Sequence, residues 1–162
     1  MSSELRHPVI RIVSGGQTCV DRGALDAAIA LGISHGGWCP RGRLAEDGRI
    51  PAQYELEETL SSDYPIRTEQ NVIDSDGTLI LFRERMHGGT QLTRRLAEKH
   101  LKPVLAIDLA GILEDGAYNF DEVRRWLSDN SVAVLNVAGP RESSSVEIAT
   151  VATTFVRRLL SG

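Results

Sequence analysis

The sequence predicts an α/β protein of Rossmann-like type, with a doubly wound, mainly parallel sheet of five or more strands and helices on both faces. Compact apolar runs of strand length alternate along the chain with amphipathic stretches of helical spacing. Apolar strands bounded by helices indicate a parallel sheet that is covered on both faces. Glycine-containing loops follow several of the strands, as expected where a strand turns into a helix.

The first half of the chain predicts strands and helices in alternation. A β-branched run over Val9–Val13 predicts the first strand. Apolar residues then recur at helical spacing over Val20–Leu31, and Gly32 supplies the stop. The next predicted elements are a Gly-containing strand over Ile33–Cys39, a loop over Pro40–Gln53, a short helix over Tyr54–Leu60 and a helix over Thr68–Asp74 with Thr68 as its cap.

The second half continues this alternation. Gly77–Phe82 contains a buried-strand run, and Arg83–Thr90 is expected to be the loop that follows it. The remaining predicted elements are a helix over Gln91–His100, a strand over Pro103–Ile107, a helix over Phe120–Leu127, a strand over Val132–Val137 and a last helix over Val146–Leu160.

Length and composition predict one ligand-binding domain over residues 1–162, with residues 1–8 flexible. The chain has 41% hydrophobic and 25% charged residues, as globular proteins do. A net charge of -4 and only 5% aromatic residues argue against nucleic acid and membrane as partners. Two cysteines, no long apolar run and no signal-peptide core predict a cytoplasmic protein.

Three predicted loops leave strand ends with glycine and hydroxyl residues, and each precedes a helix. They are Ser14–Cys19, His87–Thr90 and Gly139–Ser144. Ligands of open parallel sheets bind outside the carboxyl ends of the strands, at a switch in strand order. Glycine lets backbone amides approach an anion, and a helix N-terminus offers unpaired N–H groups. The three loops therefore predict one crevice for a phosphate-bearing small molecule.

Side chains near these loops complete the predicted site. Arg141 and Arg41 each lie in a Pro/Gly loop at a predicted strand end, where a guanidinium could bind phosphate. Trp38 could wall a pocket for a flat ring, with core packing as the equal alternative. The predicted ligand-binding residues are Gly15, Gly16, Gln17, Thr18, Arg22, Trp38, Arg41, Gly88, Gly89, Thr90, Gly139, Arg141, Glu142 and Ser143.

No catalytic residue and no metal ligand is predicted. The sequence has neither a P-loop nor a dinucleotide fingerprint, and no nucleophile elbow. His35 and Cys39 lack the second pair that a zinc site needs. A magnesium ion could bridge a phosphate to Asp21 or Glu142, but nothing in the spacing requires one. A binding protein is therefore favoured over an enzyme, although the sequence leaves open whether the protein catalyses a reaction.

Five blocks of the sequence match the motifs of a known family. The blocks are Ser14-Gly15-Gly16-Gln17-Thr18 with Val20-Asp21-Arg22 and Ala24-Leu25-Asp26, Gly37-Trp38-Cys39-Pro40-Arg41-Gly42-Arg43 with Ala45-Glu46-Asp47-Gly48, Asp74-Ser75-Asp76-Gly77-Thr78-Leu79-Ile80, Gly88-Gly89-Thr90, and Asn136-Val137-Ala138-Gly139-Pro140-Arg141-Glu142-Ser143. They resemble the molybdenum-cofactor carrier protein family, a Rossmann-like group related to lysine-decarboxylase-like and nucleotide-sensing SLOG domains. The resemblance runs from about Ile10 to beyond Ser143, most of the chain.

The resemblance implies that the protein binds and protects the molybdenum cofactor, a pterin with a dithiolene and a terminal phosphate, and delivers it. It also implies a homo-oligomer, usually a tetramer, with molybdoenzymes as recipients. The wider group implies an alternative, a nucleotide-binding sensor or a hydrolase of nucleotides or nucleoside monophosphates. An interaction domain that binds no phosphorylated ligand is the third hypothesis.

Position 19 departs from the family pattern, which commonly has glycine where this sequence has Cys19. If the backbone there needs a positive φ, the cysteine strains it. Alternatively, the thiol faces the ligand. The sequence does not decide between the two.

Overall fold

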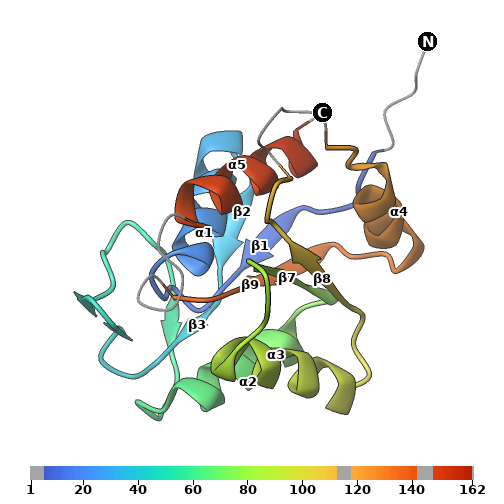
Figure 1. Cartoon of the computed structure of the whole chain (residues 1–162). Coiled ribbons are helices and arrows are strands. Elements are labelled where there is room, and N and C mark those ends of the chain that lie inside the picture. Colours follow the sequence, from blue (N-terminus) through green and yellow to red (C-terminus); the bar gives the residue numbers. More distant parts are fainter. Residues whose placement is uncertain (1–5, 113–117, 142–147, 162) are drawn as a thin grey trace.

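The computed structural model describes residues 6–112, 118–141 and 148–161. A five-stranded sheet lies at its centre (Figure 1), with the strand order β2-β1-β9-β7-β8. Each pairing in this sheet is parallel, which confirms the predicted class. The strands are β1 (Arg11–Val13), β2 (Ser34–Gly36), β7 (Gly77–Phe82), β8 (Val104–Asp108) and β9 (Val134–Ala138).

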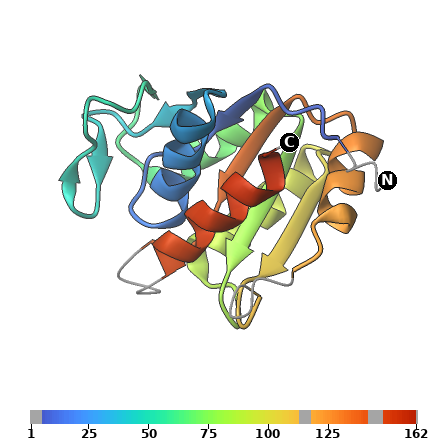
Figure 2. The ribbon, with the colours of Figure 1, turned by 90° about the horizontal axis from the view of Figure 1, so that it is seen from above.

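Helices cover both faces of the sheet. On one face α1 (Val20–Leu31), α4 (Asp121–Asp129) and α5 (Ile148–Leu160) share an apolar core with the strands. On the other face α2 (Tyr64–Asp74) packs against α3 (Gly88–Lys99), around Val72, Leu96 and Ala97. Figures 1 and 2 show α1 and α5 together on one side of the sheet and α2 and α3 on the opposite side.

The strand order is a circular permutation of the Rossmann order. The last strand in the chain, β9, lies in the middle of the sheet between β1 and β7. If β9 and α5 are placed at the start of the chain, the sheet reads 3-2-1-4-5, which is the Rossmann order 3-2-1-4-5-6 without its last strand. The two ends of the described chain meet accordingly, since the His7 ring lies 2.9 Å from the Leu160 carbonyl oxygen.

The prediction of one continuous strand over Ile33–Cys39 is wrong, because the structure divides this segment between two sheets. The break falls at Gly37, where φ is +124° and a Cβ would lie 2.3 Å from the Ser14 carbonyl oxygen. Beyond it, β3 (Trp38–Cys39) pairs in parallel with β6 (Glu57–Glu58). On the edge of β3 opposite β6, the Asn71 side chain accepts a hydrogen bond from the Trp38 N–H and donates one to the Trp38 carbonyl, as a neighbouring strand would.

The predicted helix over Tyr54–Leu60 is wrong, and the predicted loop over Pro40–Gln53 contains a short antiparallel hairpin. The hairpin consists of β4 (Leu44–Ala45) and β5 (Gly48–Arg49). The Arg43 guanidinium donates to backbone carbonyls of four later residues, Ile50, Pro51, Tyr54 and Leu56. These bonds stabilise a looped course that local propensity cannot reveal.

Helices α2 and α3 begin earlier than predicted. α2 begins at Tyr64, and the Thr68 hydroxyl bonds the Tyr64 carbonyl inside the helix instead of capping it. α3 begins at Gly88, so the predicted loop Arg83–Thr90 ends in the first helical turn. The two glycines therefore lie at the N-terminus of a helix.

Candidate functional site

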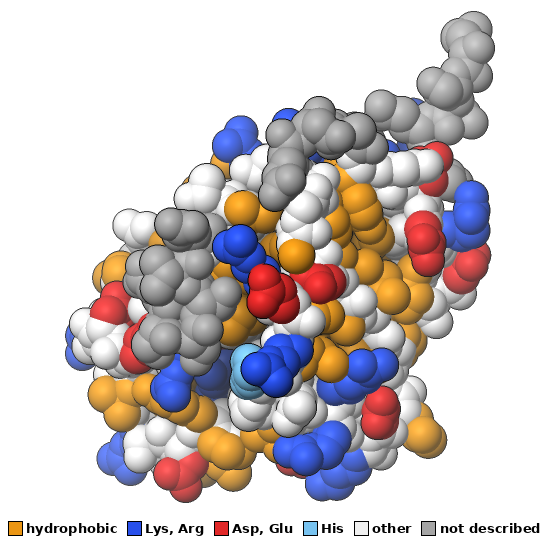
Figure 3. Space-filling model, in the orientation of Figure 1, with side chains coloured by type: hydrophobic (Ala, Val, Ile, Leu, Met, Phe, Trp, Pro, Cys, Tyr) orange, Lys and Arg blue, Asp and Glu red, His pale blue; other side chains and the backbone are white. Residues whose placement is uncertain are grey.

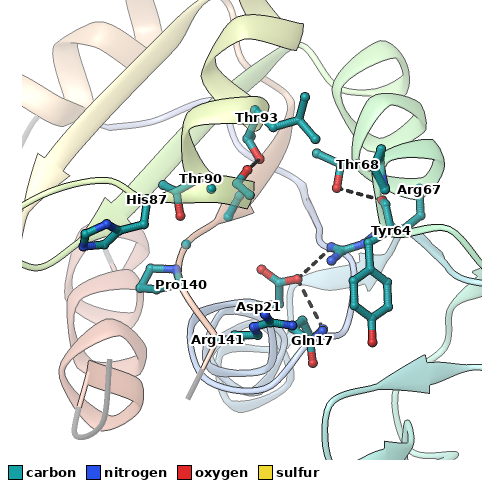
Figure 4. Close-up of a pocket in the computed structure, with 16 residues that line it drawn as sticks. Gln17, Asp21, Tyr64, Arg67, Thr68, His87, Thr90, Thr93, Pro140 and Arg141 are labelled. Carbon is teal, nitrogen blue, oxygen red and sulfur yellow. Dashed lines mark hydrogen bonds and ion pairs between the residues drawn. The ribbon is translucent and has the colours of Figure 1, made fainter. Parts of the chain in front are cut away.

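A cavity of about 400 Å³ opens where the carboxyl ends of the strands meet. The loops after β9 and β7 lead to helices on opposite faces of the sheet, which is the switch point at which such folds bind ligands. Gln17, residues 87–90 and residues 139–141 contribute to the lining, so all three predicted loops reach the same cavity. The side opposite the α3 N-terminus is lined from the first turns of α2 by Tyr64, Pro65, Arg67 and Thr68 (Figure 4).

The first turn of α3 presents backbone amides at the cavity wall. Gly88 and Gly89 begin the helix, where N–H groups have no earlier helical carbonyl to bond. A Cβ added at either glycine would meet no atom within 4 Å, so open space adjoins both. The Thr90 N–H already bonds the His87 carbonyl at 2.8 Å. Two adjacent amides at the positive end of a helix form a suitable site for an anion.

The loop after β9 contributes Gly139 and Arg141. A Cβ at Gly139 would lie 2.3 Å from the Leu81 carbonyl and 2.6 Å from Val20, so the glycine allows close packing of β9 on its neighbours. Arg141 lines the cavity with its side chain 48% exposed, and its Nε lies 3.6 Å from the Glu46 carboxylate. The predicted residues Glu142 and Ser143 lie outside the described residues.

A buried ion pair closes the inner end of the cavity. Asp21, from the first turn of α1, accepts hydrogen bonds from the Arg67 guanidinium at 3.1 Å and from the Gln17 N–H at 3.2 Å (Figure 4). Burial raises the pKa of the Asp21 carboxyl, and the positive charge of Arg67 opposes this rise. Arg67 was missed in the sequence because α2 was predicted to begin at Thr68, one residue beyond it.

Gly15 and Gly16 of the β1–α1 loop are required by close packing and by the backbone conformation. A Cβ at Gly15 would lie 1.7 Å from the Arg67 guanidinium, so this glycine makes room for the arginine. Gly16 has a φ of +75°, and its Cβ position lies 2.5 Å from Leu56. Neither glycine is among the residues that line the cavity.

Thr18 and Arg22 bind carboxylates of the β4–β5 turn. The Thr18 hydroxyl donates to Glu46, and Arg22 makes two bonds to Asp47. The hydrogen bonds that Arg22 donates to Asp47 raise the pKa of Arg22 and lower the pKa of Asp47. Thr18 thus attaches the hairpin to the β1–α1 loop and Arg22 attaches it to α1, and neither of these predicted ligand residues lines the cavity.

Trp38 and Arg41 lie elsewhere in the structure. Trp38 lines a second cavity, of about 510 Å³, and its indole N–H donates to Asp74 at 2.7 Å. The exposed Arg41 lines neither cavity, and its backbone N–H bonds the Ser61 carbonyl. The structure therefore brings together Gln17, the residues of the α3 N-terminus and those of the β9 loop, but separates them from Trp38 and Arg41.

The described residues contain no group of three or more His, Cys, Asp or Glu side chains that could hold a metal ion. Within that part of the chain, no helix is long and apolar enough to cross a membrane. On the face shown in Figure 3, basic side chains are interspersed with acidic and hydrophobic ones.

Fold and cavity together define a permuted Rossmann-like domain with a pocket at its switch point. The chain belongs to the circularly permutated YpsA SLOG family, whose model matches residues 12–160. It is similar to the crystal structure of a protein from Syntrophus aciditrophicus named "Putative molybdenum carrier protein". The two share 44% identity with a TM-score of 0.89, over 97% of this chain and 98% of the other. No curated protein matches the chain.

Proposed function

We propose that this protein binds the molybdenum cofactor in the cavity between α2 and α3, shelters it from solvent and delivers it. The observation that carries the proposal is the meeting of the α3 N-terminus and the β9 loop in one cavity. The name of the 44% identical neighbour supports the choice of ligand. The cavity volume lies in the range that small-molecule sites occupy.

In this proposal the amides of Gly88 and Gly89 hold the terminal phosphate, and Arg141 adds a charged donor. Burial of the pterin between α2 and α3 then slows its decay by excluding water and oxygen. The homotetramer, the cytoplasmic location and the molybdoenzyme recipients that the resemblance implies belong to the same proposal.

The test is anaerobic comigration of molybdenum and pterin with the purified protein on a sizing column, which also reports the oligomeric state. Gly89→Val fills open space beside the amides, and we expect at least roughly tenfold weaker binding with the fold intact. The control is Gln91→Val, an exposed position on the same helix outside the cavity. Unchanged binding in Gly89→Val would remove the phosphate from this site.

Arg141→Ala gives a second comparison. We expect this change to weaken phosphate-bearing ligands by roughly tenfold, and their dephosphorylated analogues much less, because the guanidinium contacts the phosphate. Equal losses for both kinds of ligand would exclude Arg141 from the phosphate.

A second candidate is a nucleotide sensor or a nucleotide hydrolase. It is favoured by Asp21, a buried acid in the cavity whose pKa is raised, since acids of this kind often serve in proton transfer. A panel of nucleotides, assayed for binding and turnover beside the cofactor, separates the two functions. A nucleotide consumed in the absence of cofactor binding would favour the hydrolase.

A further inference from the structure

The inner end of the cavity carries a charged pair that phosphate binding does not explain. Asp21 and Arg67 both line the cavity, although their side chains are only 4% and 13% exposed. Oδ2 of Asp21 accepts bonds from Arg67 and from the Gln17 N–H. The pair is therefore held in place from two elements, α1 and α2, before any ligand arrives.

Arg67 also has an unused donor. Its Nε is buried and makes no hydrogen bond to any of the residues that the structure describes. A buried N–H without a partner costs free energy, and an acceptor atom on a ligand would recover it. The guanidinium lies 5.6 Å from the centre of the Tyr64 ring and against Gly15, which limits its movement.

A carboxylate beside a guanidinium is complementary to one kind of ring edge. The carboxylate accepts from adjacent N–H groups, and the guanidinium donates to a carbonyl oxygen. The 2-amino-4-oxopyrimidine ring that is fused in guanine and in pterin carries an exocyclic amine, a ring N–H and a carbonyl side by side, in that order. Adenine lacks two adjacent donors on its ring edge, and a sugar phosphate has no such edge.

We infer that Asp21 and Arg67 recognise the edge of a 2-amino-4-oxopyrimidine ring, as fused in guanine or pterin, in a ligand whose phosphate binds at the N-terminus of α3. The inference rests on the proposed function, because the phosphate site places the ring toward the inner end. It adds a ring specificity that the phosphate-binding loops cannot supply.

The experiment measures affinities by calorimetry for GMP, IMP, AMP, ribose 5-phosphate and neopterin monophosphate. We expect GMP or neopterin monophosphate to bind at least roughly tenfold more tightly than IMP, AMP and ribose 5-phosphate. IMP retains the carbonyl and ring N–H of GMP but lacks the exocyclic amine. Whether GMP or the pterin binds more tightly identifies the source of the ring. Equal affinities across the series would overturn the inference.

Two matched variants test the role of Asp21. Asp21→Asn is expected to weaken the preferred ligand by roughly tenfold while ribose 5-phosphate changes by less than about twofold. Asp26→Asn alters an exposed carboxylate of the same helix outside the cavity and should change neither affinity. A loss that is equal for both ligands in Asp21→Asn would reduce the pair to a structural role. Failure of every phosphorylated compound to bind, ribose 5-phosphate included, would refute the proposed phosphate site.

Discussion

The backbone at Cys19 is strained. It occupies the N-cap position of α1 with φ +74° and ψ -113°, a region that L-residues rarely adopt. Its side chain is buried and lines neither cavity. Of the two alternatives left open by the sequence, the structure therefore shows the strained backbone.

Replacement of Cys19 by glycine is expected to relieve this strain. The Cys19→Gly variant should be more stable than Cys19→Ala by about 1–2 kcal/mol, because alanine keeps the Cβ while both variants lose the thiol. The measurement is chemical unfolding of the two variants side by side. If alanine proved as stable as glycine, the positive φ would carry no cost.

At the scale of elements, the segment between β3 and α2 depends on one long side chain. Arg43 binds carbonyls from Ile50 to Leu56, so its planar group holds a loop that has little regular structure. The loop packs on Leu25 of α1 through Ala45, Ile50 and Tyr54. The same loop places Leu56 beside Gly16, which connects it to the first loop of the candidate site.

Arg43→Lys retains the charge but cannot reach several carbonyls at once. We expect it to lower the free energy of unfolding by about 2 kcal/mol, comparable to the loss of one or two bonds from a charged group. Arg41→Lys, at an exposed arginine nearby, should leave stability within about 0.5 kcal/mol. Thermal or urea unfolding measures both. Similar stability of the two variants would mean that the structure of the loop does not depend on the hydrogen bonds of the Arg43 guanidinium.

The whole molecule is organised by its permuted strand order. The two ends of the described chain lie close together, as the contact between His7 and Leu160 shows. Tertiary contacts between β9 and its neighbours β1 and β7 do not depend on where the chain is cut. Proteins with adjacent termini tolerate such rearrangement when the new cut falls in an exposed turn.

A permutant that begins at Ser131 and joins Gly162 to Ser2 should therefore fold. It restores the sequential Rossmann order, and Ser131 lies in an exposed turn with a φ of +51°. We expect circular dichroism spectra and ligand affinity to match the parent, with a melting temperature within about 10 °C. An unfolded permutant, beside a parent that folds under the same conditions, would show that the connection through Asn130 is needed.

The fold class and most of the larger elements could be predicted from local patterns in the sequence. The apolar run Gly77–Phe82 and the helix Val20–Leu31 were both predicted with the bounds that the structure shows. These patterns are local. A strand that is buried on both faces is a continuous apolar run, and a helix that is buried along one stripe repeats apolar residues every three or four positions. Three loops rich in glycine were also predicted, and the structure brings them to one cavity.

The contacts of the individual residues around the cavity could not be predicted from the sequence, because they depend on tertiary packing. Arg22 and Thr18 bind the carboxylates of a hairpin that is distant in the sequence, and Trp38 lies in a separate cavity. Arg67 reaches the cavity from a helix whose start the sequence did not reveal. Side-chain partners depend on which elements become neighbours, and strand order is set by the packing of the whole sheet. For this protein, local patterning therefore predicts the elements, whereas the set of residues that line the cavity follows from the position of β9 between β1 and β7.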